Sequence, residues 1–348
     1  MRALTVVPMT SGSLAVTDVP DPVPGEGELL VEGVALGVCG TDREIVAGEY
    51  GWAPPGADRL VLGHESLGRV RSAPDGSRLR PGDLVVGIVR RPDPEPCPAC
   101  GRGEFDMCRN GRYTERGIKE IHGYGSQLWT VEEDYAVRLA PELADVGMLL
   151  EPTTVVAKAW DHIERIGNRA WFGPRRVLVT GAGPIGLLAA LLGAQRGLEV
   201  HVLDRVDSGI KPQLVRDLGA HYHTGGIPEV ARTAVPDIVI EATGVDRLVL
   251  DAMEHNAAAG IVCLTGVSTA GRTVGFDAGA VNREIVLQND VVFGSVNANH
   301  RHYEQAAEAL AKADRSWLSR LITRRLPLER AAEAFEPGGD DVKVVIEL

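Results

Sequence analysis

The stretch from residue 176 to residue 186 reads Arg-Val-Leu-Val-Thr-Gly-Ala-Gly-Pro-Ile-Gly and decides the fold of the second half of the chain. Its first five residues predict an apolar strand, its last three begin an apolar helix, and its glycines have the spacing G-x-G-x-x-G. Gly181 permits a tight turn, Gly183 lets a pyrophosphate approach the backbone, and Gly186 lets the helix pack closely on the strand. We therefore expect a dinucleotide to bind here, with its pyrophosphate at the helix N-terminus.

An acidic residue ends the next predicted strand. Asp204 lies 18 residues after Gly186, where a carboxylate accepts hydrogen bonds from a ribose hydroxyl and repels a 2′-phosphate. Arg205 follows at once and could instead pair with a 2′-phosphate. We expect NAD to be preferred over NADP, with Pro184, Ile185, Asp204 and Arg205 contacting the cofactor. The alternative is that Asp204 is a solvated loop carboxylate.

Short apolar strands and helical patterns alternate around this loop. Strands are expected over 199–203, 237–242, 260–264 and 290–295, and helices over 184–196, 211–218 and 303–313. Strands that are apolar along their whole length belong to a parallel sheet covered on both faces. Before residue 156 the pattern differs, because short β-branched strands such as 29–34 and 83–89 are separated by Gly- and Pro-rich turns. The sequence thus predicts a β-rich region, then an α/β region, and a last strand over 342–347.

Composition limits the possible partners. The 348 residues suffice for about two domains, and 44% hydrophobic with 24% charged residues is ordinary for a globular protein. The net charge of −12 without a basic cluster argues against nucleic acid, since phosphate neutralisation needs grouped Lys and Arg. No apolar run reaches the roughly 18 residues of a membrane span, and the N-terminus lacks a signal-peptide pattern. We expect a cytoplasmic protein that binds neither nucleic acid nor membrane.

The cysteines point to metal rather than to disulfides. There are five, an odd number in a chain without an export signal, which argues against a disulfide framework. Cys97, Cys100 and Cys108 lie within twelve residues, a spacing typical of metal sites.

Further candidate zinc ligands are scattered along the β-rich region. Cys39 follows a predicted strand, His64 and Glu65 stand together, and Glu151 closes the region. Thiolate, imidazole and carboxylate are all zinc ligands. Each residue alone is weak evidence, because a single Cys is more often a small buried hydrophobe and a single Glu is more often solvated.

Taken together, these segments resemble the zinc-dependent medium-chain dehydrogenases over the whole chain. The matching segments are Val38-Cys-Gly-Thr-Asp42, Gly63-His-Glu65, the cysteine-rich lobe, the glycine-rich loop and Glu241-Ala-Thr-Gly244. Within that superfamily the chain is most similar to the archaeal-type glucose 1-dehydrogenases, through Cys39-Gly-Thr-Asp-Arg-Glu-Ile-Val46, Val89-Arg-Arg91, Glu115-Arg-Gly-Ile118, Glu151-Pro152 and residues 289–297. The implied architecture is a GroES-like, β-rich catalytic domain of residues 1–155 and 298–348, plus an α/β Rossmann domain of residues 156–297.

The resemblance implies a catalytic zinc held by Cys39, His64, Glu65 and Glu151, with one of the two carboxylates exchanging for water or a substrate oxygen. A ligand set with one thiolate leaves zinc more electron-poor than two thiolates would, which suits a Lewis acid.

A proton relay is implied as well. Thr41 would pass on the substrate proton, and Glu44 stands where some relatives keep a relay His. Val89 stands where some members have an Asn that touches the sugar, so the favoured sugar or cyclitol could differ from glucose.

Contacts to cofactor and substrate follow from the same resemblance. Thr243, Gly266 and Asn297 would contact the cofactor, and Glu115 and His302 would contact the substrate, because a carboxylate is a strong acceptor for sugar hydroxyls. The alternatives are a solvated loop for Glu115, a helix cap for Asn297 and a surface position for His302.

The cysteine-rich lobe of such enzymes holds a structural zinc through the pattern C-x2-C-x2-C-x7-C. Its first position falls on Pro94 here, so Cys97, Cys100 and Cys108 remain. An oxygen ligand could come from one of three nearby acids: Asp93, Glu95 or Asp106. The alternative to bound zinc is an empty lobe with free thiols.

The implied reaction is zinc- and NAD(P)-dependent oxidation of a sugar or polyol hydroxyl, with an aldose 1-dehydrogenase that produces a lactone as the favoured interpretation. The alternative is a cyclitol, aminocyclitol or secondary-alcohol dehydrogenase. An edge strand near 290–295 would pair across a two-fold axis, so a homodimer or homotetramer is expected.

Overall fold

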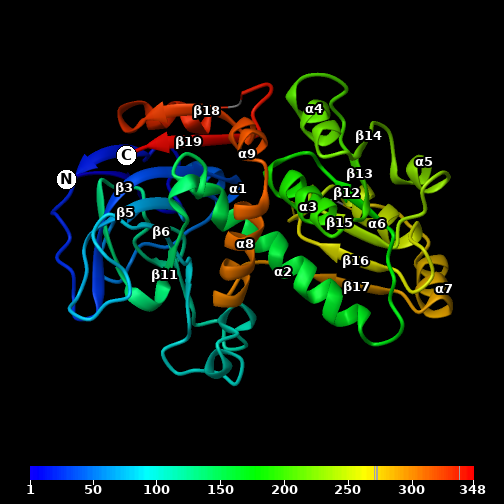
Figure 1. Ribbon diagram of the computed structural model, residues 1–348, viewed down its shortest axis with the longest axis horizontal. Helices are drawn as coiled ribbons and strands as arrows, with labels where there is room; N and C mark the ends of the chain where they lie inside the picture. The colour runs from blue at the N-terminus through cyan, green and yellow to red at the C-terminus, as the bar shows by residue number, and fades with distance from the viewer. Residues whose placement is uncertain (270, 272, 337) are drawn as a thin grey trace. The chain divides into compact units, whose positions relative to one another are not determined.

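The computed structural model describes residues 1–269, 271, 273–336 and 338–348, which form two compact units (Figure 1). The first unit consists of Met1–Glu151 and Ala298–Leu348, and the second unit is Pro152–Asn297. The first boundary thus lies after Glu151, where the sequence pattern had placed it after residue 155. In the described part of the chain, no helix combines the length and the apolarity that crossing a membrane requires.

The second unit is built on a six-stranded parallel sheet with the order β14-β13-β12-β15-β16-β17. Its strands are β12 (Arg176–Thr180), β13 (Glu199–Leu203), β14 (His221–His223), β15 (Ile238–Glu241), β16 (Ile261–Leu264) and β17 (Val291–Gly294). Numbered within the unit, this is the order 3-2-1-4-5-6 of dinucleotide-binding sheets. The Rossmann prediction is confirmed, and only the short strand β14 was not expected.

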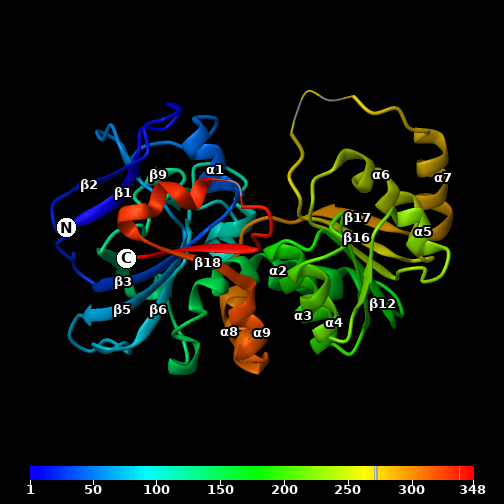
Figure 2. The ribbon, with the colours of Figure 1, turned by 90° about the horizontal axis from the view of Figure 1, so that it is seen from above.

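Helices cover both faces of this sheet. They are α2 (Leu150–Gly167), α3 (Pro184–Gln195), α4 (Ile210–Asp217), α5 (Ile227–Ala231), α6 (Asp246–Glu254) and α7 (Ala278–Gln288). Figure 2 shows α3 and α4 on one face and α5, α6 and α7 on the other. Helix α3 is buried along most of its length, which explains why its sequence is apolar on every side.

The described residues of the first unit form three sheets. A seven-stranded sheet has the order β11-β6-β5-β3-β19-β18 with β10 also paired to β3, and two three-stranded sheets have the orders β2-β1-β4 and β7-β8-β9. The strands are β1 (Arg2–Val6), β2 (Ala15–Asp18), β3 (Glu28–Val38), β4 (Leu60–Val61), β5 (Glu65–Ser72), β6 (Leu84–Gly87), β7 (Arg90–Arg91), β8 (Thr114–Arg116), β9 (Glu120–Ile121), β10 (Leu128–Glu132), β11 (Ala136–Arg138), β18 (Ile322–Pro327) and β19 (Lys343–Glu347). The helices are α1 (Gly40–Ala47), α8 (His300–Lys312) and α9 (Arg315–Leu321).

The C-terminal segment completes the core of the first unit. Strand β19 pairs antiparallel with β3, with Val344 opposite Val38 and Ile346 opposite Leu36. These side chains are buried in the same apolar cluster as the N-terminal strands. The last residues of the chain therefore reach the segment that carries Cys39, which directly follows β3.

Candidate active site

Cys39 and His64 meet at the end of strand β3. Cys39 stands between β3 and α1, and its Sγ atom lies 3.1 Å from Nε2 of His64, a buried residue in the turn before β5. The other ring nitrogen of His64, Nδ1, lies 3.4 Å from Oδ1 of Asp42 on α1. The second carboxylate oxygen of Asp42 accepts a hydrogen bond from the backbone N–H of Cys39 at 3.0 Å.

Asp42 therefore orients both predicted ligands. A carboxylate at Nδ1 of an imidazole fixes the tautomer that presents Nε2 to a metal ion, as in many zinc sites. Asp42 stands in the motif Val38-Cys-Gly-Thr-Asp42, but the motif alone does not predict this role. The feature in the sequence that could have indicated this role is an acidic residue three positions after Cys39, in the first turn of a helix.

Glu65 is held by a buried lysine. Both carboxylate oxygens of Glu65 accept from Nζ of Lys343 at 2.7 Å, and Lys343 also donates to the carbonyl of Val38 at 3.1 Å. A Cβ atom on Gly37 would lie 2.0 Å from the Glu65 carboxylate, so this glycine makes room for it. Lys343 was missed. Its signal was a single lysine at the head of the apolar strand Lys-Val-Val-Ile-Glu.

Cys39, His64 and Glu65 each offer one potential ligand atom, and these three atoms all lie within 4.8 Å of one another. Glu151, the second residue of α2, belongs to the same charged group. Burial raises the pKa of the Glu151 carboxyl to about 7, with Glu65 adding to the shift and His64 and Lys343 opposing it.

The charges in this group favour a cation. Burial raises the pKa of the Cys39 thiol. Burial alone would lower the pKa of His64, but the negative charges of Cys39 and Asp42 outweigh it and raise that pKa well above its ordinary value. A half-buried thiol, a buried imidazole and two carboxyl groups in one place are the donor set that zinc takes, and a divalent ion would stabilise the deprotonated forms. The residues present therefore fit a zinc ion.

Two predicted relay residues lie on α1. Thr41 is half-buried and Glu44 is exposed. Residues three positions apart are neighbours on a helix surface. Thr41 therefore lies near Cys39 in the chain, and Glu44, one turn further along α1, lies at the solvent-exposed end of the pair.

The glycine-rich loop has the conformation that its sequence predicts. Gly181 has a φ of 88°, which a residue with a side chain rarely adopts. A Cβ atom on Gly186 would lie 1.8 Å from the carbonyl oxygen of Gly181, so α3 can pack on β12 only with glycine there. A Cβ atom on Gly183, the residue before α3, would meet no atom within 4 Å. Pro184 and Ile185 form the first turn, and the space beside Gly183 suits a pyrophosphate.

Asp204 is bonded to this loop. Its Oδ2 atom accepts from the backbone N–H of Ala182 at 2.6 Å, and its Oδ1 atom accepts from Val206 at 3.2 Å. The alternative of a solvated carboxylate is therefore wrong. Arg205 is exposed, and Nζ of Lys211 lies 3.9 Å from the Asp204 carboxylate. Lys211 was not among the predicted cofactor residues.

A buried carboxylate fixes two neighbouring loops at the carboxyl ends of the parallel strands. Glu241 is fully buried and accepts from Thr180 Oγ1 at 3.0 Å, from the N–H of Thr243 at 2.8 Å and from the N–H of Gly244 at 3.0 Å. A Cβ atom on Gly266 would lie 2.7 Å from the same carboxylate. The predicted cofactor residues Thr243 and Gly266 thus flank Glu241, at the edge where open α/β sheets bind ligands.

The structure revises the alternatives considered for Asn297 and His302. Asn297 has a left-handed backbone with a φ of 62° and does not cap a helix; the cap of α8 is Asn299, whose side chain accepts from the N–H of Arg301. His302 is fully buried rather than on the surface, and its Nδ1 atom accepts from the N–H of Asn299 at 3.2 Å.

Glu115 lies in a buried ion pair, so its alternative as a solvated loop residue is also wrong. Its Oε1 atom accepts from Nε and Nη2 of Arg90 at 3.1 and 2.9 Å. Arg90 also donates to the carbonyl of Asp106 at 3.0 Å and lies over the ring of Tyr113. The β7–β8 pairing brings Arg90 opposite Glu115.

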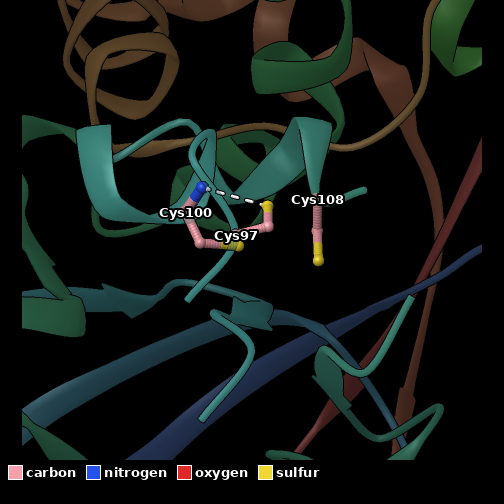
Figure 3. A group of neighbouring side chains, drawn as sticks. All are labelled: Cys97, Cys100 and Cys108. Atoms are coloured by element: carbon pink, nitrogen blue, oxygen red, sulfur yellow. Dashed lines mark hydrogen bonds between the residues drawn. The ribbon is translucent and has the colours of Figure 1, made fainter. Parts of the chain in front are cut away.

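The three lobe cysteines gather around one point (Figure 3). The Sγ atom of Cys97 accepts from the N–H groups of Cys100 at 3.5 Å and Arg109 at 3.4 Å, and these bonds lower the pKa of Cys97 to about 6. Burial raises the pKa of Cys100 to about 11. Backbone N–H groups that point at a sulfur stabilise its thiolate, the form that binds zinc.

The three acids suggested as a fourth lobe ligand lie in different surroundings. Glu95 pairs with Arg112 at 2.8 Å on the surface, and Asp106 accepts from Nδ2 of Asn299 at 2.8 Å. Asp93 is buried; its Oδ1 atom accepts from the N–H of Glu95, and its Oδ2 atom lies 3.4 Å from Nε of Arg112.

Known proteins match the chain along its whole length. Residues 25–141 match the family described as "Alcohol dehydrogenase GroES-like domain", and residues 144–348 match the family "Glucose dehydrogenase C-terminus". The chain is 40% identical to the glucose 1-dehydrogenase of Methanocella arvoryzae and 39% identical to glucose 1-dehydrogenase 1 of Caldivirga maquilingensis, covering 100% of this chain and 99% of each relative. Among solved structures, it is similar to Haloferax mediterranei glucose dehydrogenase in complex with NADP, Zn and gluconolactone, with 34% identity, a TM-score of 0.92 and coverage of 100% and 99%.

Proposed function

This chain belongs to the glucose 1-dehydrogenase family of the zinc-dependent medium-chain dehydrogenases, and we propose that it oxidises the anomeric hydroxyl of an aldose to give a lactone. The observation that carries the proposal is the contact of 3.1 Å between Cys39 Sγ and His64 Nε2, next to buried carboxyl groups. Together with the glycine-rich loop, it supplies both halves of a dehydrogenase: a metal-binding group and a dinucleotide-binding group.

Cys39 and His64 would hold zinc, with Glu151 and Glu65 as the oxygen donors. Bound zinc supplies Lewis acidity, which makes a substrate hydroxyl a stronger acid. Asp42 keeps the His64 ring in its ligating orientation, and Lys343 balances the charge of Glu65. A bound nicotinamide cofactor supplies the hydride acceptor.

The residues of α1 would carry the proton away. Thr41 is half-buried, and its hydroxyl both donates and accepts, so it can pass a proton from the substrate hydroxyl to Glu44. Glu44 is exposed and can release the proton to water.

An aldose ring carries several hydroxyls, and only the anomeric one is oxidised. The enzyme therefore needs fixed polar side chains that bind the other hydroxyls and so orient the sugar. We assign Glu115 to this task, with Arg90 as the residue that holds its carboxylate in one orientation. His302 on α8 lies 4.0 Å from the carboxylate of Asp106, whose carbonyl accepts from Arg90, so His302 would help to keep that arginine in place.

A spectrophotometric screen tests the function. The zinc-loaded protein is assayed with aldoses, polyols, cyclitols and secondary alcohols, with NAD and with NADP. The expected result is the highest kcat/KM with an aldose and a lactone as the product. A clear preference for a cyclitol, an aminocyclitol or a simple secondary alcohol would overturn the sugar assignment, and no activity with any of them would overturn the enzyme assignment.

For the cofactor we propose a preference for NAD. Both oxygens of Asp204 are bonded to backbone N–H groups, so its carboxylate cannot swing away from a 2′-phosphate. At an effective dielectric constant near 20, charges about 4 Å apart interact by a few kcal/mol, and Arg205 and Lys211 offset part of that repulsion. We expect NAD to be favoured about tenfold in kcat/KM, or about 1.4 kcal/mol.

Substitutions at the same position check this expectation. Asp204→Ser should shift the preference towards NADP, and Arg205→Ala should weaken NADP more than NAD. The structure of the Haloferax mediterranei relative contains NADP, which points in the opposite direction. The decisive measurement is therefore kcat/KM of the natural chain with NAD and with NADP. A higher kcat/KM with NADP there would show that the cations prevail over Asp204.

We also propose a homodimer or homotetramer. Strand β17 is an edge strand of the parallel sheet. Close to it in the sequence are three exposed apolar residues: Val286 and Leu287 before the strand, and Val296 after it. An unpaired edge flanked by apolar side chains favours pairing with a second copy. Light scattering at micromolar concentration should give twice or four times the chain mass, and Val296→Asp should lower it. A monomer of the natural chain would contradict this expectation.

A further inference from the structure

A cluster of three histidines and one glutamate lies on strands β13 and β14. His201 on β13 pairs in register with His221 on β14, and Leu203 pairs with His223. Alternate residues of a strand point to the same face, so Glu199 and His201 share a face, as do His221 and His223. The cluster belongs neither to the glycine-rich loop nor to the group around Cys39.

The rings are stacked, and candidate ligand atoms of the cluster lie close together. The ring centroids of His201 and His221 are 4.8 Å apart, with 22° between the planes. Nε2 of His201 lies 3.1 Å from Oε1 of Glu199, and Nδ1 of His201 lies 2.9 Å from Nε2 of His223. One ligand atom each from Glu199, His201 and His221 lie within 4.8 Å of one another. Ligands at about 2.0–2.2 Å from a zinc ion are themselves about 3–4 Å apart, so the side chains must move closer together. Because the lone pair of an imidazole nitrogen lies in the plane of the ring, one of the two stacked rings must also turn about its Cβ–Cγ bond to face the same ion.

The neighbouring charges leave this group able to bind a cation. Arg176 on β12 pairs with Oε2 of Glu199 at 3.0 Å, which leaves Oε1 towards His201. A neutral imidazole carries one nitrogen lone pair that can bind a metal ion, so His201 and His221 can each supply one ligand.

We propose that Glu199, His201 and His221 form a further metal site, which binds a divalent transition-metal ion such as Zn²⁺. Two imidazoles and one carboxylate suit zinc and its neighbours rather than Mg²⁺ or Ca²⁺, which prefer oxygen ligands. His223 would complete the site without ligating: with the ion bound, Nδ1–H of His201 would donate to Nε2 of His223, and Nε2 of His201 would give its lone pair to the ion in place of its contact with Glu199 Oε1.

Such an ion would join an edge strand to its neighbour. β14 has three residues and lies at the end of the sheet opposite β17. The ligands come from both β13 and β14, so the ion would stabilise their pairing by mass action. The site is thus structural, and it adds one ion per chain to whatever the group around Cys39 and the cysteine-rich lobe bind.

Counting bound zinc tests the proposal on the complete protein with its resident metal. The natural chain, His221→Ala, His223→Phe and the control Thr224→Ala are dialysed against Zn²⁺ in the micromolar range, and zinc per chain is measured by elemental analysis. His221 and Thr224 are both exposed, so neither change disturbs the core. We expect the natural chain and Thr224→Ala to hold one zinc ion more than His221→Ala.

Calorimetric titration with Zn²⁺ gives the affinity of that extra ion. Loss of a hydrogen-bond partner behind a ligand typically weakens metal binding by about 10–100-fold, which is the effect expected for His223→Phe. Equal zinc content in the natural chain and His221→Ala would overturn the site. Unchanged affinity in His223→Phe would overturn the role assigned to His223.

Discussion

Replacing Cys39 or His64 by alanine is expected to lower kcat/KM for sugar oxidation by at least about 10³-fold and to remove one zinc ion per chain. Cys39 Sγ and His64 Nε2 are 3.1 Å apart, so the two side chains would ligate the same zinc ion. Lewis-acid activation contributes several kcal/mol to such reactions, and about 4 kcal/mol corresponds to a factor of about 10³.

Kinetics and elemental analysis of the same preparations check this result. Cys263→Ala is the matched control, because Cys263 is a buried cysteine of the second unit, and burial raises its pKa to about 12. Cys263 belongs to neither group of candidate zinc ligands, so the control should keep both its zinc and its activity. Near-full turnover in Cys39→Ala, or an unchanged zinc content, would show that catalysis does not depend on this pair.

The sequence predicted those parts of the protein that depend on neighbours close in the chain. The loop of Gly181, Gly183 and Gly186 follows from local backbone geometry, and its strand and helix lie where the apolar pattern placed them. The parallel sheet was predicted for the same reason, since each buried strand is apolar along its length.

The residues that support the site could not be predicted in this way. Lys343 pairs with Glu65 across 278 positions, and only the pairing of β19 with β3 brings them together. Arg90 reaches Glu115 only because β7 and β8 pair. A carboxylate on its own looks the same in the sequence whether it is solvated, as was considered for Glu115, or holds a buried arginine.

The histidine cluster was missed for a related reason. His221-Tyr-His223 is too short and too polar to indicate a strand, and β14 exists because it pairs with β13. Without that pairing the three histidines have no common face. Register between strands is a tertiary property, and it is what turns separate polar residues into a site.

Lys343→Met is expected to lower the melting temperature of the first unit by about 10 °C. Lys343 and Glu65 are 1% and 2% exposed as side chains, and their ion pair has a length of 2.7 Å. Removing one partner of a buried pair leaves the other charge uncompensated, at a cost of about 3–5 kcal/mol. A unit of this size loses roughly 2–4 °C per kcal/mol.

The double variant Glu65→Gln/Lys343→Met separates the cost of the unpaired charge from the cost of lost packing. Replacing both partners of a buried pair by neutral groups is often close to neutral, so the double variant should melt several degrees above Lys343→Met. Lys312→Met is the control, because its ion pair with Glu308 is exposed, and such pairs contribute little.

Calorimetry of the four proteins measures the effect. If Lys343→Met melts like the natural chain, Glu65 does not need Lys343 as its countercharge, and the role assigned to the lysine is wrong. If the double variant melts no higher than Lys343→Met, the lysine stabilises β19 through packing alone, and the charge balance assigned to this pair is wrong.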